Sequence, residues 1–243
     1  MASRKLLDPR FLLLSLGNPK PYTDTLHSAG HHALRALQAD LPAQPAFSKT
    51  EAFGKPCQAS VGDKFTLVQS PTLMNVSGNF AHGAWKRALS RESEPERLHM
   101  VFVHDDMEEE LGTIKLREYK TSHRGHNGMK DVKAQMQEKK YPGARWAKIS
   151  IGIGRPISRK GDSVTRWVLR PMTEGETVTI ERESAAGIMR CLDEWMAKFE
   201  NQAKRAEALA AARLAARSDS KSPSKTPSKP KSMSASDSDS DPA

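Results

Sequence analysis

Four short polar clusters in this chain of 243 residues carry side chains that could do chemistry. Three contain an asparagine that helix or strand propensity would not choose, and the fourth is a histidine followed by two acids. The clusters are L-G-N-P at 16–19, M-N-V-S-G at 74–78, H-D-D at 104–106 and G-H-N-G at 125–128. An asparagine amide offers donors and an acceptor without charge, so amides that converge on one pocket could bind a carbonyl, a peptide group and a ribose hydroxyl together.

A histidine near the start of the first predicted helix supplies a base for such a pocket. His27 follows Tyr22 and Thr25, directly before a helix predicted from Ser28. Each asparagine taken alone is most simply a turn residue, and a lone histidine is more often a cap. Here, however, an aspartate of the H-D-D cluster could hold His27 in one tautomer. Water activated in this way is a hydrolytic catalyst whose proton transfer contributes about 10²–10⁴-fold.

Signatures of competing chemistries are absent or incomplete. The serine hydrolase elbow G-x-S-x-G and the phosphate-binding G-x-x-x-x-G-K-S/T do not occur, and the G-I-G at 152–154 lacks a third glycine that opens a helix. His27 and His31 have i, i+4 spacing without H-E-x-x-H, and His123 and His126 are a similarly weak metal signal. We therefore expect no serine nucleophile, no metal and no other cofactor.

Short apolar segments alternate along the chain with helical patterns, which predicts an α/β domain with one sheet flanked by helices. The predicted strands are residues 11–16, 65–69, 100–103, 113–117 and 147–153, and the predicted helices are 28–39, 80–89, 129–138 and about 176 to beyond 199. The apolar run at 100–103 predicts a strand buried on both faces. Residues 104–106 then lie at the carboxyl edge of the sheet, where open α/β sheets keep their sites.

Charge is distributed unevenly along the chain. The net charge of +9 belongs entirely to residues 1–217, because four lysines and four aspartates cancel in residues 218–243. A basic folded part favours a polyanionic partner, with nucleic acid first and an anionic membrane surface second. The last segment is rich in Ser, Lys, Pro and Asp and has almost nothing to bury, so we expect a disordered tail at 218–243.

The predicted organisation is an N-terminal extension at 1–10, a folded domain at 11–200, a basic helix at 201–217 and the tail. Two cysteines without nucleophile or metal context are consistent with a reducing compartment. No segment reaches the roughly 18 apolar residues of a membrane span. Residues 2–10 carry three basic residues and one acid, so we expect either a cytoplasmic or a mitochondrial protein.

The assembled motifs resemble the bacterial-type peptidyl-tRNA hydrolase family. The ordered matches run from about residue 11 to 199: L-G-N-P-x-x-Y-x-x-T-x-H, P-T-L-M-N-V-S-G, H-D-D-M, G-H-N-G-M-K-D and I-G-I-G-R-P. The resemblance implies a single α/β domain with a mixed sheet and no metal. It also implies a monomeric enzyme that hydrolyses the ester between tRNA and a peptide or N-blocked amino acid.

The resemblance assigns roles to individual residues. His27 matches the general base, Asp105 the carboxylate that orients it, and Asn18 the amide that screens for a blocked amino group. The residues that match substrate-binding positions are Tyr22, Leu73, Asn75 and Asn127. Basic residues expected to contact tRNA are Arg117, Lys130, Lys133 and Lys148.

Two departures from the family pattern lie beside these residues. Leu26 and Ser28 flank the histidine where the family usually has Arg and Asn, so the hydrogen bonds around the base are expected to differ. The approach to G-H-N-G, residues 119–124, is bulkier and more basic than the usual glycine-rich segment, which puts its mobility in question. Two alternatives remain open: a relative that binds RNA or assists splicing without turnover, and an unrelated α/β esterase, which the missing serine elbow disfavours.

Overall fold

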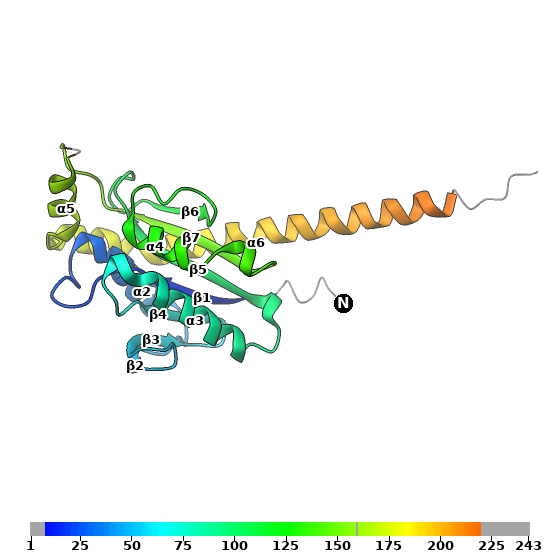
Figure 1. The fold of residues 1–243 in the computed structure, drawn as a ribbon, viewed down its shortest axis with the longest axis horizontal. Helices are drawn as coiled ribbons and strands as arrows, with labels where there is room; N and C mark the ends of the chain where they lie inside the picture. The colour runs from blue at the N-terminus through cyan, green and yellow to red at the C-terminus, as the bar shows by residue number, and fades with distance from the viewer. Residues whose placement is uncertain (1–7, 159, 220–243) are drawn as a thin grey trace, which may run out of the picture. The chain divides into compact units, whose positions relative to one another are not determined.

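A central mixed sheet organises the computed structural model, which describes residues 8–158 and 160–219 (Figure 1). Seven strands were found in this part of the chain, in the order β2-β3-β4-β1-β5-β7-β6. Their bounds are β1 Arg10–Ser15, β2 Ser48–Thr50, β3 Cys57–Val61, β4 Phe65–Gln69, β5 Leu98–Asp106, β6 Ile114–Glu118 and β7 Arg145–Gly152. Strands β4, β1, β5 and β7 are parallel, whereas β2, β3 and β6 pair antiparallel.

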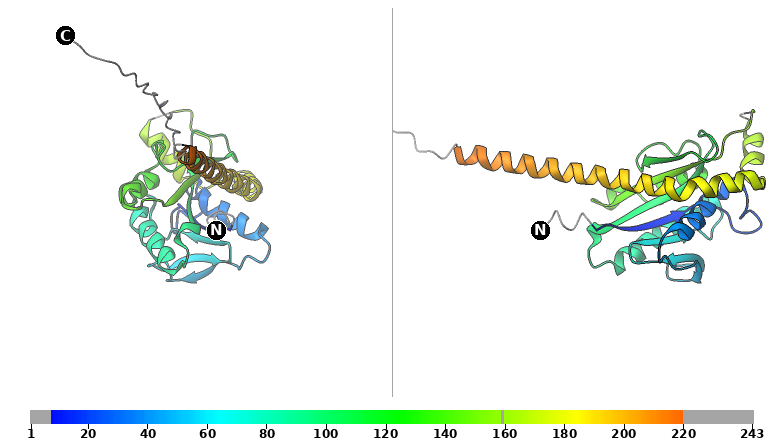
Figure 2. Two further views of the ribbon diagram at one scale, coloured as in Figure 1. Left: turned by 90° about the vertical axis from the view of Figure 1, so that its right-hand side faces the viewer. Right: turned by 180° about the vertical axis from the view of Figure 1, so that it is seen from behind.

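The helices lie on both faces of this sheet (Figures 1 and 2). They are α2 Ala29–Asp40, α3 Ser77–Arg91, α4 Asn127–Gln135, α5 Gly161–Leu169 and α6 Glu174–Asp219, with short 3₁₀ turns η1 Leu26–Ser28, η2 Met74–Val76, η3 Pro95–Arg97 and η4 Glu138–Lys140. The chain consists of two compact units, with the boundary between Ala203 and Lys204. The sheet lies in the first unit, and the described part of the second is helical.

Alternate residues of the inner strands belong to two separate cores. In β1, Phe11 and Leu13 pack with residues of α2 and α6, whereas Leu12 and Leu14 pack with residues of α3 and α4. Every residue of β5 is buried, because both of its faces are covered. A strand covered on both sides needs a continuous apolar run, which is the pattern that predicted it.

The topology places a crevice at the carboxyl ends of the central strands. After β4 is added on one side of β1, the chain crosses to add β5 on the other side, so the strand order reverses at β1. The connections that leave the ends of β1, β4 and β5 therefore diverge around a common space. Ligand sites of open α/β sheets form at such a point.

Most of the predicted elements are present with shifted ends, and three were missed. β2 and β3 were missed because their sequences, S-K-T and C-Q-A-S-V, are short and weakly apolar. Cys57 is buried at the start of β3. α5 was also missed, and α6 ends two residues beyond the predicted helix end at 217. Residues 1–7 and the rest of the predicted tail, 220–243, lie outside the described part.

None of the helices in the described residues is long and apolar enough to cross a membrane.

Gly30 allows α2 to approach the ends of β1 and β5, and this contact gives a test of the fold. A Cβ at Gly30 would lie 2.6 Å from the carbonyl oxygen of Val103 and 2.8 Å from that of Leu16. We expect Gly30→Ala to lower the free energy of unfolding by about 1–3 kcal/mol through overpacking. Gly175→Ala, where a Cβ meets nothing within 4 Å, should change it by less than about 1 kcal/mol and in the stabilising direction. Urea unfolding of both variants measures this, and equal stabilities would contradict the close approach.

Candidate active site

A cavity of about 310 Å³ lies at the carboxyl edge of the sheet. Its walls come from the segments that follow β1, β4 and β5, and from the start of α4 and the last turns of α5. The structure brings to this one cavity all seven residues predicted to be catalytic or substrate-binding: Asn18, Tyr22, His27, Leu73, Asn75, Asp105 and Asn127. Residues separated by more than 100 positions in the chain thus share one site.

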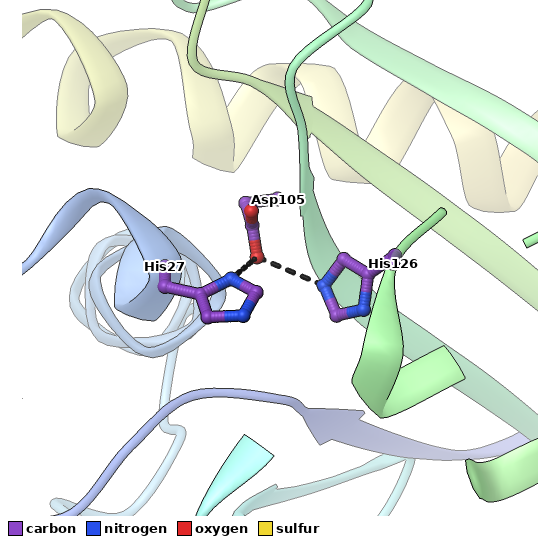
Figure 3. A group of neighbouring side chains, drawn as sticks. All are labelled: His27, Asp105 and His126. Carbon is purple, nitrogen blue, oxygen red and sulfur yellow. Dashed lines mark hydrogen bonds and ion pairs between the residues drawn. The ribbon is translucent and has the colours of Figure 1, made fainter. Parts of the chain in front are cut away.

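Two histidines converge on one carboxylate oxygen in the cavity wall (Figure 3). His27 Nδ1 and His126 Nε2 each lie 2.9 Å from Asp105 Oδ1. The side chain of Asp105 is 3% exposed and that of His27 is 13% exposed. The carboxylate is therefore shielded from water, while His27 reaches the cavity.

The hydrogen bonds fix the tautomer of each ring. His126 Nδ1 accepts from the backbone N–H of Met129 and so caps α4, which requires that Nε2 carries the proton donated to Asp105. The carboxylate of Asp105 likewise requires a proton on Nδ1 of His27. The neutral His27 ring then keeps an unprotonated Nε2, which is the atom able to accept a proton.

The pKa values of this group follow from burial and from the shared carboxylate. Burial alone would lower the pKa of His27, but the charge of Asp105 and its hydrogen bond outweigh burial and raise that pKa above 6.5. Burial would raise the pKa of Asp105, but the two imidazoles hold it far below its ordinary range. Asp105 is consequently a permanent anion that stabilises the protonated form of His27.

His104 supports the cluster from inside the protein. Its Nδ1–H donates to the backbone carbonyl oxygen of Asp105 at 2.7 Å, and its ring packs edge-on against His126 with centroids 4.8 Å apart. Burial lowers the pKa of His104 to about 3, with a smaller contribution from His126. The ring is therefore neutral near pH 7. Its Nε2 has no hydrogen-bond partner in the described structure.

Asn18 is oriented by the backbone of the neighbouring loop. Its Oδ1 accepts from the N–H of Met74 at 2.8 Å, and its own backbone N–H donates to Ser28 Oγ at 3.0 Å. Ser28 Oγ in turn donates to the carbonyl oxygen of Tyr22 at 2.8 Å. With Oδ1 engaged, the side-chain NH₂ of Asn18 is the group left for a ligand. Ser28 thus holds the turn that carries Asn18, while Leu26 is buried in the core.

The other two asparagines lie in helical segments that line the cavity. Asn75 lies in η2 and Asn127 is the first residue of α4, and both are exposed. The segments that carry them are tied together because the backbone N–H of Gly78 donates to Asp131 Oδ2 at 2.6 Å. A Cβ at Gly78 would lie 2.5 Å from the carbonyl oxygen of Asp131, so α3 and α4 meet closely there.

One wall of the cavity was not anticipated from the sequence. It is formed by Met107 and by four side chains of α5, namely Val164, Thr165, Val168 and Leu169. Val164 and Val168 stand four residues apart, so a helical pattern was available, but the helix is only nine residues long and was not predicted. This part of the lining is largely apolar.

Two acidic residues at the edge of the cavity, Asp106 and Glu109, bind several of the basic residues. Glu109 forms ion pairs with Lys115, Arg117 and Arg124, and Arg124 Nη1 also donates to Asp106 Oδ2 at 2.8 Å. Burial opposes ionisation, but these cations lower the pKa of Glu109 to about 2. Arg117, predicted to contact tRNA, is therefore paired within the protein.

The position of Lys148 does not support its predicted contact with tRNA, because a direct contact needs an ammonium group on the surface. Lys148 is only 2% exposed, and its Nζ donates to the carbonyl oxygens of Thr121 and Ser122, each at 3.0 Å. Every residue of β7 after Arg145 is buried, so the strand is also covered on the face that carries Lys148. Lys133 is partly buried and also donates to backbone carbonyls, whereas Lys130 is exposed on α4.

The same three side chains could also be considered as metal ligands. The ligand atoms of His27, Asp105 and His126 lie within 4.8 Å of one another, and they form the one such group among the described residues. Both ring nitrogens that face Asp105 carry protons in the hydrogen-bonded arrangement. A metal would have to replace both protons. The convergence is thus already explained by hydrogen bonding.

Comparison with known proteins gives a consistent result. A family model described as peptidyl-tRNA hydrolase matches residues 12–214. The peptidyl-tRNA hydrolase of Delftia acidovorans is 36% identical over 172 residues, which cover 70% of this chain and 76% of that protein. That of Saccharomyces cerevisiae is 33% identical over 195 residues, which cover 77% of this chain and 97% of that protein.

The fold has a matching counterpart among solved structures. The crystal structure of peptidyl-tRNA hydrolase from Acinetobacter baumannii aligns with a TM-score of 0.56 at 20% identity, covering 79% of this chain and 95% of that chain. This likeness concerns the fold.

The shared carboxylate predicts a measurable effect on His27. Asp105→Asn removes the charge that raises the pKa of His27 and leaves burial, which lowers it, so the imidazole should titrate at a lower pH in the variant. NMR titration of the ring protons measures both proteins. His104, with a pKa of about 3, should stay neutral in both and serves as the internal control. An unchanged pKa of His27 would show that Asp105 does not set its protonation.

Proposed function

The chain belongs to the peptidyl-tRNA hydrolase family, and we propose that it hydrolyses the ester that joins a peptide or an N-blocked amino acid to tRNA. The observation that carries the mechanism is the convergence of His27 and His126 on Asp105 Oδ1 beside a cavity lined by three asparagines. The reaction would release a free tRNA and a peptide that ends in a carboxylate.

The chemical step uses the unprotonated Nε2 of His27. A water molecule attacks the ester carbonyl carbon while His27 Nε2 takes one of its protons, and the charge of Asp105 stabilises the imidazolium that forms. The carbonyl oxygen becomes an oxyanion that asparagine N–H groups of Asn75 or Asn127 can stabilise. When the C–O bond breaks, the proton passes from His27 to the ribose oxygen that leaves.

His126 limits the freedom of this arrangement. Since Asp105 Oδ1 already accepts from His126 Nε2, the carboxylate cannot rotate without losing one of two hydrogen bonds. The position of His27 is then fixed relative to the water that it activates. Positioning of this kind contributes to rate because the reacting atoms do not have to search for their geometry.

Selection for a blocked amino group is assigned to Asn18. Its NH₂ group is a donor that faces the cavity, because its Oδ1 is held by Met74. The carbonyl of a peptide or an N-acyl group accepts from such a donor, whereas a free α-ammonium offers no acceptor there. The apolar wall from α5 provides contact for the side chains of the peptide.

Basic residues on α3 and α4 support binding of the tRNA. Lys86 and Lys130 are exposed. The positive charges on this face lower the pKa values of two nearby histidines. Burial lowers the pKa of His82, and the charges of Lys86 and Lys140 lower it further. Burial also lowers the pKa of His123, and the charges of Lys133 and Lys130 lower it further. We assign this face, rather than the paired Arg117 or the buried Lys148, to the phosphate backbone.

All the residues assigned to the reaction come from one chain, so we propose that the enzyme acts as a monomer. Because the proposed substrate is produced by translation, we propose that the enzyme acts in the cytosol or the mitochondrion.

A substitution of His27 tests the proposal. Wild-type protein should hydrolyse N-acetyl-aminoacyl-tRNA and act much more slowly on the unblocked aminoacyl-tRNA. His27→Ala should slow hydrolysis of the blocked ester by about 10²–10⁴-fold, because the proton acceptor is lost. Acid-precipitable label that remains on the tRNA measures the ester.

The control for this experiment is Asn201→Ala, an exposed change on α6 outside the cavity and away from the proposed tRNA face, which should keep wild-type activity. Persistence of the blocked ester with wild-type protein that still binds tRNA would favour the RNA-binding alternative. A His27→Ala protein as active as wild type would refute the role given to His27.

A further inference from the structure

The segment between β6 and α4, residues 119–126, brings His126 and then Asn127 to the cavity; we call it the amide loop. Its start is anchored because the buried Tyr119 donates its hydroxyl proton to the carbonyl oxygen of Met136 at 2.7 Å. Its end is anchored by the hydrogen bond from His126 to Asp105. Residues 120–124, between these anchors, are held by side chains that reach them from neighbouring elements.

Lys148 holds the middle of the amide loop from below. Its side chain rises from β7, and its ammonium donates to two consecutive carbonyl oxygens, those of Thr121 and Ser122, at 3.0 Å each. Both acceptors are neutral, although the lysine is 2% exposed. Burying an ammonium costs free energy unless the group is well hydrogen-bonded. The two carbonyls offset this cost, and they identify residues 121–122 as the backbone that Lys148 holds.

Two further contacts hold the same stretch of chain. Lys133, from α4, donates to the carbonyl oxygens of Lys120 and Thr121 at 3.1 and 2.8 Å. Arg124, which has a positive φ of 50°, is tied to Asp106 and Glu109. The backbone carbonyls of Lys120, Thr121 and Ser122 therefore accept hydrogen bonds from two ammonium groups. Arg124, in the turn that follows, forms ion pairs with two carboxylates.

We propose that Lys148 is a positioning residue for hydrolysis, which fixes the carbonyls of Thr121 and Ser122 and so holds the amide loop that presents His126 to Asp105 and Asn127 to the cavity. This inference rests on the proposed function. It gives Lys148 a role other than the predicted contact with tRNA, because the residue is 2% exposed and its ammonium already donates to two backbone carbonyls.

The effect on catalysis passes through the amide loop. If the carbonyls of Thr121 and Ser122 lose their donor, the loop can shift, and the second hydrogen bond that restrains Asp105 shifts with it. A displacement of about 1 Å in such a group is enough to slow a reaction by about 100-fold. The tRNA surface on α3 and α4 is unchanged by the loss, so the defect should lie in kcat rather than in KM.

Protonation of Lys148 should be visible in the pH profile. Burial, followed by the charges of Lys133 and Arg117, lowers the pKa of Lys148 to about 8. Deprotonation above that pH weakens the grip, because charge-assisted hydrogen bonds are about twice as strong as neutral ones. The titratable and charged groups that face Lys148 from β5, β6, α4 and the amide loop are His104, Asp106, Arg117, Lys133, His123 and Arg124.

Stability should change in the opposite direction, which separates the two effects. A lowered pKa means that the folded chain loses this proton near pH 8, whereas the unfolded chain keeps it to about pH 10.4. The contribution of Lys148 to the free energy of unfolding therefore rises across this range. An alkaline loss of activity cannot then be attributed to unfolding caused by this residue.

Lys148→Met, which keeps the length of the side chain and removes the donor, is the principal test. We expect kcat for N-acetyl-aminoacyl-tRNA to fall by about 10–100-fold and KM to change by less than about threefold. The alkaline limb of kcat/KM near pH 8 should disappear, and amide hydrogen exchange should accelerate in peptides that cover residues 119–126 and not elsewhere. Lys148→Arg, with a cavity of about 160 Å³ beside it, keeps a cationic donor and should recover most of kcat.

Two matched variants separate positioning from a loss of charge. Lys55→Met removes an exposed lysine far from the amide loop in sequence and should behave as wild type. Lys130→Met removes an exposed lysine of the proposed tRNA face, and should reduce the slope of log KM against log salt by about 0.9 if duplex behaviour applies. Lys148→Met should leave that slope unchanged.

The proposal is overturned if Lys148→Met keeps wild-type kcat, or if it raises KM and flattens the salt dependence as Lys130→Met does. It is also overturned if exchange accelerates throughout the protein, since Lys148 would then serve only general stability. If the methionine variant does not fold, the wild-type alkaline limb and the arginine variant decide the same question. Wild-type protein that fails to hydrolyse the ester refutes the proposed function, whereas the exchange comparison still reports whether Lys148 holds the loop.

Discussion

A single carboxylate oxygen, Asp105 Oδ1, accepts hydrogen bonds from His27 and from His126, and the geometry of the site depends on this double contact. A buried carboxylate without such partners would take up a proton, because burial disfavours its charge. The two imidazoles reverse that tendency and keep Asp105 ionised. The charge in turn raises the pKa of His27, so three segments of the chain are coupled through one atom.

The fold brings the three residues of this contact together from separate elements. β5 is covered on both faces and ends at the carboxyl edge of the sheet, which delivers Asp105 beside the turn after β1. The close approach of α2 at Gly30 brings η1, and with it His27, against the end of β5. The third partner, His126, comes from the amide loop, and its other ring nitrogen caps α4. A shift of any of these elements would change the hydrogen bonds of the Asp105 carboxylate.

Much of this arrangement could be predicted from the sequence, and the remainder has physical reasons for escaping prediction. The apolar run before H-D-D and the asparagine clusters carried enough local information to place Asp105, His27 and the amides at one edge. Lys148 could not be assigned correctly, because a lysine is normally exposed and only the tertiary structure shows two carbonyls above it. The role of His126 depends on a ring orientation that spacing does not encode. α5 was missed because a helix of nine residues spans too few turns to give a strong periodic pattern.

The bulky amide loop is compatible with the same chemistry as a glycine-rich one because its backbone is held from several sides. The role of His27, held by Asp105, as the proton acceptor can be tested by comparing two pH dependences. kcat/KM for N-acetyl-aminoacyl-tRNA should fall about tenfold per pH unit on the acid side. The midpoint should coincide with the raised pKa of His27 measured by NMR in the same buffer. A kcat/KM that stays constant while His27 takes up its proton would show that another group accepts the proton.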